Sequence, residues 1–388
     1  MPLSEVLDFR EGPGILAKDF RAAGVPLIRL SGLKSSTVID GCNFLDERDV
    51  DKRWSQFRLK LGDTLLSTSA SLGEVATVDS TGIGAVPYTG IIYFRPKDDR
   101  VRADFVPLML REQSFKNQIE AMGVGSVMKH FGPSHLRHMT VTVPPPSEQK
   151  AIAGVLGAID DKIAANTALA AKVDSYLAGT LDAVVGGTRE SSALSTIAAV
   201  NALKVKPSSD GHLRYVDIAS VGVGDFVFPE VSDWAEAPGR ARRGLRRGDT
   251  IWSTVRPNRR SHALNLSEDP LLVASTGLAV LSPTTVGFAY LYEVTKRPDF
   301  TAYLENVAEG SAYPAVRSDR FLGAPIPALH AEDIERFEAV AAPLREAVFA
   351  ATEENRTLAA TRDLLLPQLM SGKLRVRNAE ALAAEAGV

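Results

Sequence analysis

Two kinds of hydrophobic pattern alternate along this chain. Runs such as Gly90-Ile-Ile-Tyr-Phe94 and Leu278-Ala-Val-Leu281, bounded by clusters of Gly, Pro, Asp and Ser, are typical of short β-strands. From about Ser147 to Val185 and from Ala331 to Met370 the sequence is instead rich in Ala, Leu, Glu and Arg, which favours helix. The pattern predicts roughly 140 residues of strands and turns, then a long helix, and then the same plan again.

Apolar residues in both predicted helices recur three and four positions apart, the spacing of a coiled-coil seam. The seam of the first helix reads Ile152, Val155, Ile159, Lys162, Asn166, Leu169, Val173 and Tyr176. The seam of the second runs from Ile334 to Leu369 and includes Asn355. Buried amides at Asn166 and Asn355 would fix the helix register, whereas a seam displaced by one residue would leave both in solvent. The sequence leaves both interpretations open.

An internal repeat with an offset of about 185 residues runs through the chain. Gly62-Asp63-Thr64-Leu-Leu-Ser-Thr68 returns as Gly248-Asp249-Thr250-Ile-Trp-Ser-Thr254, and Thr89-Gly90 returns as Thr276-Gly277. Gly125-Ser126 returns as Gly310-Ser311, and Asn166 and Asp174 match Asn355 and Asp363 at a constant interval. The shared order of these matches indicates a duplicated domain.

The predicted helices are longer than a compact domain needs, since about 40 residues of helix extend ~60 Å. One helix follows each copy, so antiparallel pairing would place the copies at opposite ends about a pseudo-twofold axis. We expect an α+β fold: two tandem mixed α/β domains separated by two long helices that pair as an antiparallel coiled coil. A duplex with two separated half-sites would match this arrangement. The expected segments are a first domain at 1–146, helices at 147–187 and 331–375, a second domain at 188–330, and a disordered or short helical tail at 376–388.

With this repeat and these helices, the chain resembles the specificity subunit of type I restriction-modification enzymes over nearly its whole length. The closing segment Leu358-Ala-Ala-Thr-Arg-Asp-Leu-Leu-Leu-Pro-Gln-Leu-Met-Ser-Gly-Lys-Leu374 and the two Gly-Asp-Thr turns look like recurrent motifs of that family. Each motif is weak by itself, but their order is specific. The Ala-rich, acidic tail from Asn378 to Val388 departs from the resemblance.

The resemblance implies two target-recognition domains, each reading one half of a bipartite sequence in double-stranded DNA, with helices that set the spacer. It also implies docking of two methyltransferase subunits, which bind S-adenosylmethionine and methylate adenine, and association with a restriction/translocase subunit. This chain would then be a non-catalytic recognition subunit without a cofactor of its own.

The sequence lacks the motifs of nucleotide-binding and adenine-methylating enzymes. It has no Walker A motif, no complete Gly-x-Gly-x-x-Gly and no Asn/Asp-Pro-Pro-Tyr/Phe segment. His135 and His138 lack further ligands nearby, so we expect no metal site, and Cys42 is the only cysteine, so no internal disulfide forms. Without an export signal or a run of about 18 apolar residues, we expect a cytoplasmic protein with no membrane span.

Arginines concentrate between Arg240 and Arg260, where eight occur with Asp249 as the only acid, although the chain's net charge is −3. Such a run is usually a solvated face. Here it leads into Arg256-Pro-Asn-Arg-Arg260, whose side chains can contact phosphates and base edges. The expected DNA-binding residues are Ser67, Thr68, Ser69, Lys129, His130, Arg243, Arg256, Asn258, Arg259, Arg260, Tyr313, Arg317 and Ser318. Alternatively, Tyr313 packs in a core; Asp63 and Asp249 are expected to shape turns.

Two other functions compete with DNA reading. A coiled-coil scaffold would bind proteins without touching DNA, and it would lack the steep salt dependence that phosphate contacts give. An unrecognised enzyme such as a nuclease would need acids clustered near a lysine in one loop, which the sequence does not contain.

Overall fold

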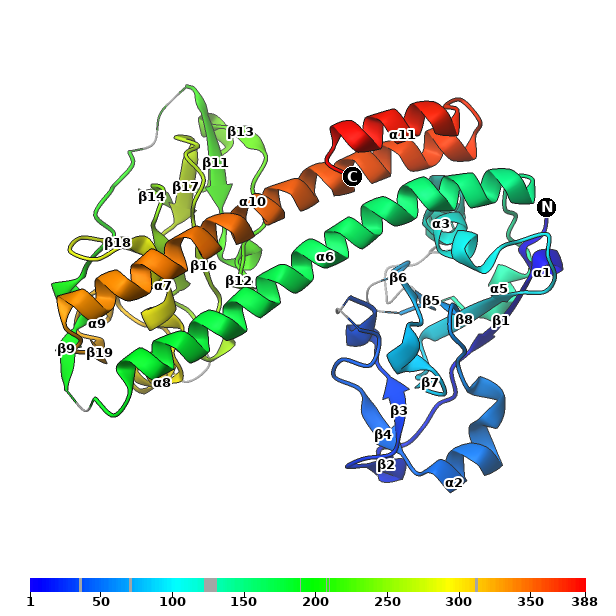
Figure 1. Ribbon diagram of the computed structural model, residues 1–388, viewed down its shortest axis with the longest axis horizontal. Helices are drawn as coiled ribbons and strands as arrows, with labels where there is room; N and C mark the ends of the chain where they lie inside the picture. The colour runs from blue at the N-terminus through cyan, green and yellow to red at the C-terminus, as the bar shows by residue number, and fades with distance from the viewer. Residues whose placement is uncertain are drawn as a thin grey trace. The chain divides into compact units, whose positions relative to one another are not determined.

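The computed structural model describes residues 1–388 apart from 35–36, 70–71, 122–130, 189, 207, 209 and 311–312, and it divides into two compact units. Unit 1 comprises Met1–Ala168 and Glu353–Val388, and unit 2 comprises Leu169–Thr352. Each unit therefore combines one strand-rich domain with segments of both long helices (Figure 1).

Among its described residues, unit 1 has two sheets of four strands. The first is antiparallel in the order β1 (Leu7–Glu11), β8 (Ile91–Pro96), β5 (Thr64–Ser67), β6 (Val75–Thr77). The second has the order β2 (Phe20–Arg21), β4 (Asn43–Leu45), β3 (Val25–Ile28), β7 (Val86–Pro87), with β3 and β7 parallel. The first four residues of β8 are buried, which confirms the strand predicted from this apolar run.

The strands described in unit 2 form sheets of five, four and two strands. The first has the order β10 (Ala198–Val200), β18 (Leu278–Pro283), β15 (Thr250–Ser253), β16 (His262–Leu264), β12 (Val223–Gly224). The second has the order β13 (Val231–Asp233), β11 (His212–Val216), β17 (Leu272–Ser275), β14 (Ala241–Gly244). The third pairs β19 (Pro325–Pro327) with β9 (Ser191–Ala193).

The two units share a sheet topology. The antiparallel series β1-β8-β5-β6 corresponds to β10-β18-β15-β16. The series β4-β3-β7 corresponds to β13-β11-β17, and the last two strands of each series, β3 with β7 and β11 with β17, pair in parallel. β5 and β15 begin at the threonines of the two Gly-Asp-Thr motifs. The sequence repeat is therefore a duplicated fold, and the expected α+β class is confirmed.

The Gly-Asp turns before β5 and β15 are built in the same way. Gly62 and Gly248 have φ angles of +81° and +88°, a conformation that side chains disfavour. The carboxylates of Asp63 and Asp249 accept hydrogen bonds from the backbone N–H groups of Lys60 and Arg246, both at 2.7 Å. These aspartates are buried and shape their turns, as expected from the sequence.

A matched test follows from the other partners of these aspartates. Asp63 forms a two-bond ion pair with Arg95, at 2.8 and 2.5 Å, whereas burial raises the pKa of Asp249 against the effect of a hydrogen bond with Ser282. Asp63→Asn should lower the free energy of unfolding by about 1–3 kcal/mol, because Arg95 loses its counter-charge. Asp249→Asn should change it by less than about 1 kcal/mol. Urea unfolding at pH 7 compares the two variants, and equal losses would contradict this assignment.

The two long helices are α6 (Pro146–Val185) and α10 (Ala331–Met370), which lie within a residue of the helical sequence patterns but end before the expected segment ends at 187 and 375. In unit 1, Ile152 and Ile159 from the first half of α6 share a core with Leu365 from the last half of α10. In unit 2, Leu177 from the last half of α6 shares a core with Phe337 from the first half of α10. The helices are therefore antiparallel in each unit, as expected.

The amides of Asn166 and Asn355 meet within unit 1. Asn166 Nδ2 donates to Asn355 Oδ1 at 2.9 Å and to Glu354 Oε2 at 2.7 Å. Asn355 Nδ2 reaches the carbonyl of Ile163 at 3.4 Å. The interpretation in which both amides point into solvent is wrong, while their role in fixing the helix register stays a prediction.

Beyond Asn166, the seam predicted for α6 is correct at Val173 but wrong at Leu169 and Tyr176. Leu169 and Tyr176 are 41% and 57% exposed, and the buried residues that follow are Val173, Leu177, Leu181 and Val185, spaced four apart. Alternating steps of three and four suit a helix that faces another helix along its length. Here the helix also packs on the domain of unit 2, which selects a different face.

Shorter helices complete both units. Those of unit 1 are α1 (Leu3–Val6), α2 (Glu47–Asp49), α3 (Val106–Arg111), α4 (Gln113–Ala121), α5 (Pro133–Leu136) and α11 (Val376–Glu385). Those of unit 2 are α7 (Phe288–Lys296), α8 (Pro298–Asn306) and α9 (Ser318–Leu322). In the described part of the chain, no helix has the combined length and apolar character required to cross a bilayer.

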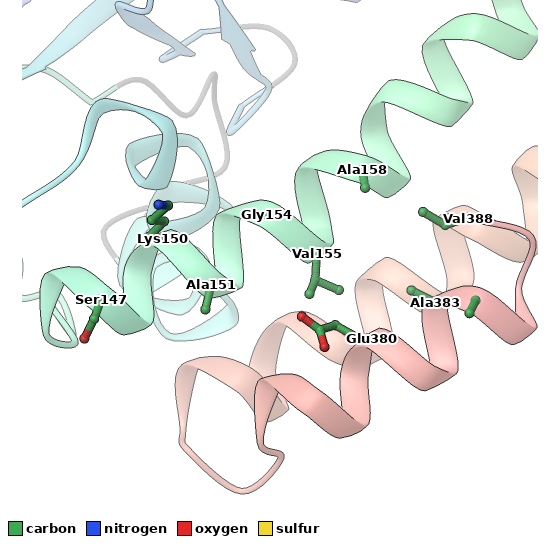
Figure 2. Close-up of a pocket in the computed structure, with 10 residues that line it drawn as sticks. Ser147, Lys150, Ala151, Gly154, Val155, Ala158, Glu380, Ala383 and Val388 are labelled. Atoms are coloured by element: carbon green, nitrogen blue, oxygen red, sulfur yellow. The ribbon is translucent and has the colours of Figure 1, made fainter.

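The C-terminal tail, expected to be disordered or a short helix, forms α11. Its Ala379 and Ala383 are buried in the same core as Ile152 of α6 and Leu369 of α10. A pocket of about 420 Å³ lies between α11 and the first turns of α6, with Val155 and Glu380 in its lining (Figure 2). The tail is therefore part of the structure of unit 1.

Candidate nucleic-acid interface

Three segments of unit 2 meet beyond the end of β15. The backbone N–H of Thr254 donates to the carbonyl of Gly277 at 2.9 Å, and the N–H of Val316 donates to the carbonyl of Thr254 at 2.7 Å. The N–H of Arg256 donates to the carbonyl of Pro314, also at 2.7 Å. The loop after β15, the turn between β17 and β18, and the segment before α9 thus form one surface, which brings together residues far apart in the sequence.

The half-buried Arg256 and the exposed Tyr313 lie together on this surface. The Arg256 guanidinium lies 4.6 Å from the centre of the Tyr313 ring, and Tyr313 is 70% exposed. The alternative in which Tyr313 packs in a core is therefore wrong. An arginine stacked on an exposed aromatic ring presents both a charge and a flat apolar face to a ligand.

Backbone strain concentrates in the same region. Among the described residues, the non-glycine residues with positive φ are Asn201, Arg256 and Arg260, all in unit 2. Arg256 and Arg260 flank the tight turn Pro257–Arg259. Each left-handed residue costs on the order of 1 kcal/mol or more, and such strain often occurs at binding sites.

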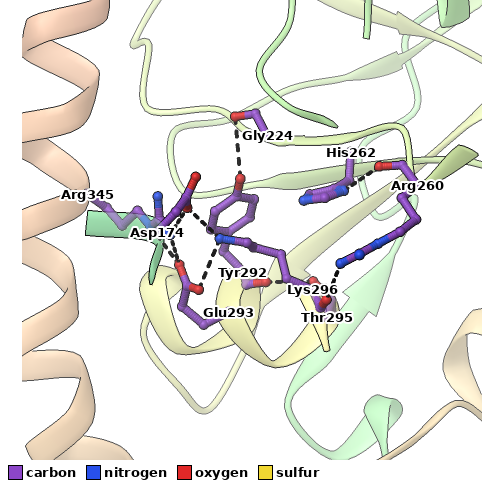
Figure 3. A network of polar contacts seen from close by, with 9 residues as sticks. All are labelled: Asp174, Gly224, Arg260, His262, Tyr292, Glu293, Thr295, Lys296 and Arg345. Atoms are coloured by element: carbon purple, nitrogen blue, oxygen red, sulfur yellow. Dashed lines mark hydrogen bonds and ion pairs between the residues drawn. The ribbon is translucent and has the colours of Figure 1, made fainter. Parts of the chain in front are cut away.

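The other residues predicted in this loop differ in where their side chains lie. Asn258 and Arg259 are exposed at the turn. Arg260 instead donates to the carbonyl of Lys296 at the end of α7, at 2.9 Å (Figure 3). This contact directs Nη2 of Arg260 toward α7, and a contact of Arg260 with DNA stays a prediction.

Arg243 and Ser318 also lie together. Arg243 Nη2 is 3.5 Å from Ser318 Oγ, which accepts a hydrogen bond from Asn201 Nδ2 at 2.9 Å. Arg317 is exposed and pairs with Asp319 at 3.4 Å. The structure thus places Arg243, Arg317 and Ser318 around the start of α9, next to the segment that carries Tyr313.

The corresponding loop of unit 1 differs from the prediction. The Thr68 N–H donates to the Gly90 carbonyl at 2.8 Å, as Thr254 does to Gly277. Ser67 and Thr68 are only 1% and 0% exposed, so their side chains face the core, which corrects their assignment as DNA contacts. Ser69 is half-buried. Lys129 and His130 lie outside the described residues.

A buried ionic network joins the domain of unit 2 to both long helices (Figure 3). Asp174 of α6 accepts from Lys296 of α7 and from Arg345 of α10, both at 2.6 Å. Arg345 also donates to Glu293 of α7 at 2.6 Å. Burial by itself would raise the pKa of Asp174, but Lys296 and Arg345 outweigh it and lower that pKa. The network balances two acids against two bases and fixes α7 on the helix pair.

Unit 1 has a similar ionic connection. Asp160 of α6 accepts from Arg111 at the end of α3 at 3.0 Å and from Arg362 of α10 at 2.9 Å. Asp160 therefore links the domain of unit 1 to α10 through two arginines. In both units a base at the end of a domain helix and an arginine of α10 share one aspartate of α6.

Sequence reasoning missed most residues of these connections. Arg111, Glu293, Lys296 and Arg345 lie in segments far apart along the chain, and nothing in their local sequence marks them. Arg345 does lie at a position next to the predicted seam residue Leu344, so a polar residue beside an apolar stripe was the available signal.

No metal centre emerges from the described residues. They contain no group of three or more His, Cys, Asp or Glu side chains arranged to hold an ion. His135 Nδ1 instead accepts a hydrogen bond from the backbone N–H of Gly132 at 3.1 Å. The unit 2 surface, with its arginines and exposed tyrosine, is therefore the better candidate for a binding site.

Comparison with known proteins agrees with this geometry. Residues 1–175 match the type I restriction modification DNA specificity domain. The type I restriction enzyme MjaVIII specificity subunit of Methanocaldococcus jannaschii is 24% identical over 169 residues, which are 42% of this chain and 39% of that relative. The S subunit of a type I restriction-modification system from M. genitalium has a TM-score of 0.57 at 15% identity, over 95% of each chain. Residues 1–175 therefore match the type I restriction modification DNA specificity domain, and the fold of the chain is similar to that of the M. genitalium S subunit over 95% of its length.

Proposed function

We propose that this chain is the DNA-reading specificity subunit of a type I restriction-modification complex. Each strand-rich domain reads one half of a bipartite site in double-stranded DNA, and the paired helices α6 and α10 set the spacer. The same helices dock two methyltransferase subunits, which bind S-adenosylmethionine and methylate adenine, and a restriction/translocase subunit joins the assembly. Methyl transfer takes place in those partners, and this chain supplies recognition.

The duplicated domain carries this proposal. Residues 1–175 match a DNA specificity domain, and the sheet order of that domain returns in unit 2. Two copies of one reading module need a target with two parts. The candidate surface of unit 2 adds arginine, asparagine and tyrosine side chains, which contact phosphates and base edges in protein–DNA complexes.

Methylation mapping tests the proposal directly. The chain and its neighbouring methyltransferase are produced together in cells that lack adenine methylation, and methylated adenines are mapped in the genome. We expect one bipartite sequence with a fixed spacer to be methylated throughout. Methylation without sequence preference, or none despite a stable complex, would overturn the proposal.

Arg256 and Arg259 should contribute to binding of the mapped site. Replacing either by Ala should weaken binding by about 1–3 kcal/mol if its contact is to a base edge, and it should relax the sequence preference in one half-site only. Fluorescence anisotropy with the mapped duplex and with duplexes altered in each half measures both effects.

Arg247→Ala provides the matched control. Arg247 belongs to the same arginine-rich run, but it pairs with Glu346 of α10 and donates to the carbonyl of Leu266. This variant should keep the sequence preference of the wild type. If Arg256→Ala, Arg259→Ala and Arg247→Ala are indistinguishable in affinity and preference, the loop after β15 is not part of the interface.

A further inference from the structure

A basic pocket lies beside the candidate surface of unit 2. It has a volume of about 490 Å³ and is lined by Asn201, Lys204, Val205, Lys206, Arg242, Arg243 and Thr276. The segment after β10 forms it by running along β14: the N–H of Gly244 donates to the carbonyl of Leu203 at 3.0 Å, and the N–H of Val205 donates to the carbonyl of Arg242 at 2.9 Å. This pairing brings two lysines beside two arginines that are distant from them in the sequence.

Four basic side chains line the pocket, and its described lining contains no acid. Lys204 and Lys206 are exposed, and Arg242 and Arg243 are half-buried. Within the described part of the chain, no ion pair joins any of these four side chains to a carboxylate. The charge is therefore available to an anion from outside.

Arg243 and Arg345 differ in their partners: Arg345 has carboxylates, and Arg243 has no anionic partner among the described residues. Arg345, which is 4% exposed, has the carboxylates of Asp174 and Glu293 as partners. Among the described residues, the side chain of Arg243 has the long contact to Ser318 Oγ, and its Nη1 is buried without a hydrogen-bond partner. Burial lowers the pKa of Arg243, which reflects the cost of removing an uncompensated cation from water. An entering anion would supply the missing partner.

We propose that this pocket binds a phosphate group of the DNA backbone next to the bases read by the unit 2 surface. The proposal rests on the proposed function and names a contact that the recognition loops do not provide. Arginine and lysine are the side chains that hold phosphates, and Thr276 adds a hydroxyl at the rim. The lining has no aromatic ring on which a base could stack, so it suits a phosphodiester better than a free nucleotide. Arg243 of the pocket contacts Ser318, which places the pocket beside the segment that carries Tyr313.

The test is a salt titration of the full chain with a mixed-sequence duplex, comparing the wild type with Lys204→Gln/Lys206→Gln. Both lysines are exposed, so the variant should keep its fold, which thermal unfolding checks. We expect the salt slope, log K against log salt concentration, to fall by about one, the value for one phosphate contact, and affinity near 0.1 M salt to fall roughly tenfold. The ratio of specific to non-specific binding should stay unchanged, because phosphate contacts carry no sequence information.

Lys172→Gln/Arg336→Gln is the control, since it removes two charges from exposed positions of α6 and α10 in the same unit. It should bind the duplex like the wild type, and an equal loss in both variants would overturn the pocket. A wild-type slope and affinity in Lys204→Gln/Lys206→Gln would overturn it as well, while leaving the proposed function intact. If that variant loses only the binding of inorganic phosphate and not of duplex, the pocket belongs to a free anion and the backbone assignment is wrong. Failure of the wild type to bind duplex at all would instead overturn the proposed function.

Discussion

Replacing Arg345 by Ala should lower the free energy of unfolding of unit 2 by about 3–5 kcal/mol, the range found when one partner of a buried ion pair is removed. Glu293 is 2% exposed and accepts from Arg345 Nε at 2.6 Å. Without the guanidinium, Glu293 keeps only Lys296, at 3.2 Å, and Asp174 also loses one of its two bases. Two acids would then share one cation, and water could replace the lost partner at Asp174, whose side chain is 46% exposed, but not at the buried Glu293.

Urea unfolding, followed by circular dichroism and tryptophan fluorescence, measures this loss. Arg336→Ala is the control on the same helix, because Arg336 pairs with Asp333 at the surface and should contribute less than about 1 kcal/mol. Arg345→Met with Glu293→Gln removes charge from both partners and should recover much of the stability. If the double variant is as unstable as Arg345→Ala, the loss comes from packing and not from unpaired charge.

Periodicity made the helical part of the fold predictable from the sequence. Steps of three and four placed α6 and α10 closely, and they brought Asn166 and Asn355 to equivalent positions that meet at 2.9 Å. The ordered repeat similarly predicted one topology for both domains. The seam prediction was wrong at Leu169 and Tyr176, because which face of a helix is buried depends on the domain it packs against.

The candidate surface could be predicted only in part. The arginine-rich run was one feature in the sequence, but the fold gives its members different partners: Arg247 contacts α10, Arg260 contacts α7, and Arg256 stacks on Tyr313. Spacing along the chain does not determine these directions. Lys204 and Lys206 were missed because only strand pairing brings them to Arg243, and no local pattern predicts that pairing.

Lowering the pH from 6.5 to 4 should weaken unit 2 by about 3 kcal/mol through His262 alone. His262 is 1% exposed, and its ring stacks on Trp252 at 4.7 Å. Its Nδ1 lies 2.6 Å from the carbonyl oxygen of Arg260, which can only accept, so Nδ1 carries the proton of the neutral ring. Nε2 is buried without a hydrogen-bond partner among the described residues, and its protonation would create an unpaired donor there.

Burial accordingly lowers the pKa of His262 from 6.5 to about 4. Between these values the unfolded chain binds a proton that the folded chain does not, so the full stability is present above pH 6.5 and is lost as the pH falls toward 4. His262→Phe keeps an aromatic ring against Trp252 but cannot titrate. It should be less stable than the wild type at pH 7, because the Arg260 carbonyl loses its donor, and the gap should close by about 3 kcal/mol by pH 4. Thermal unfolding at several pH values measures this gap, in which groups common to both proteins cancel. Parallel pH profiles would assign the acid sensitivity to other residues.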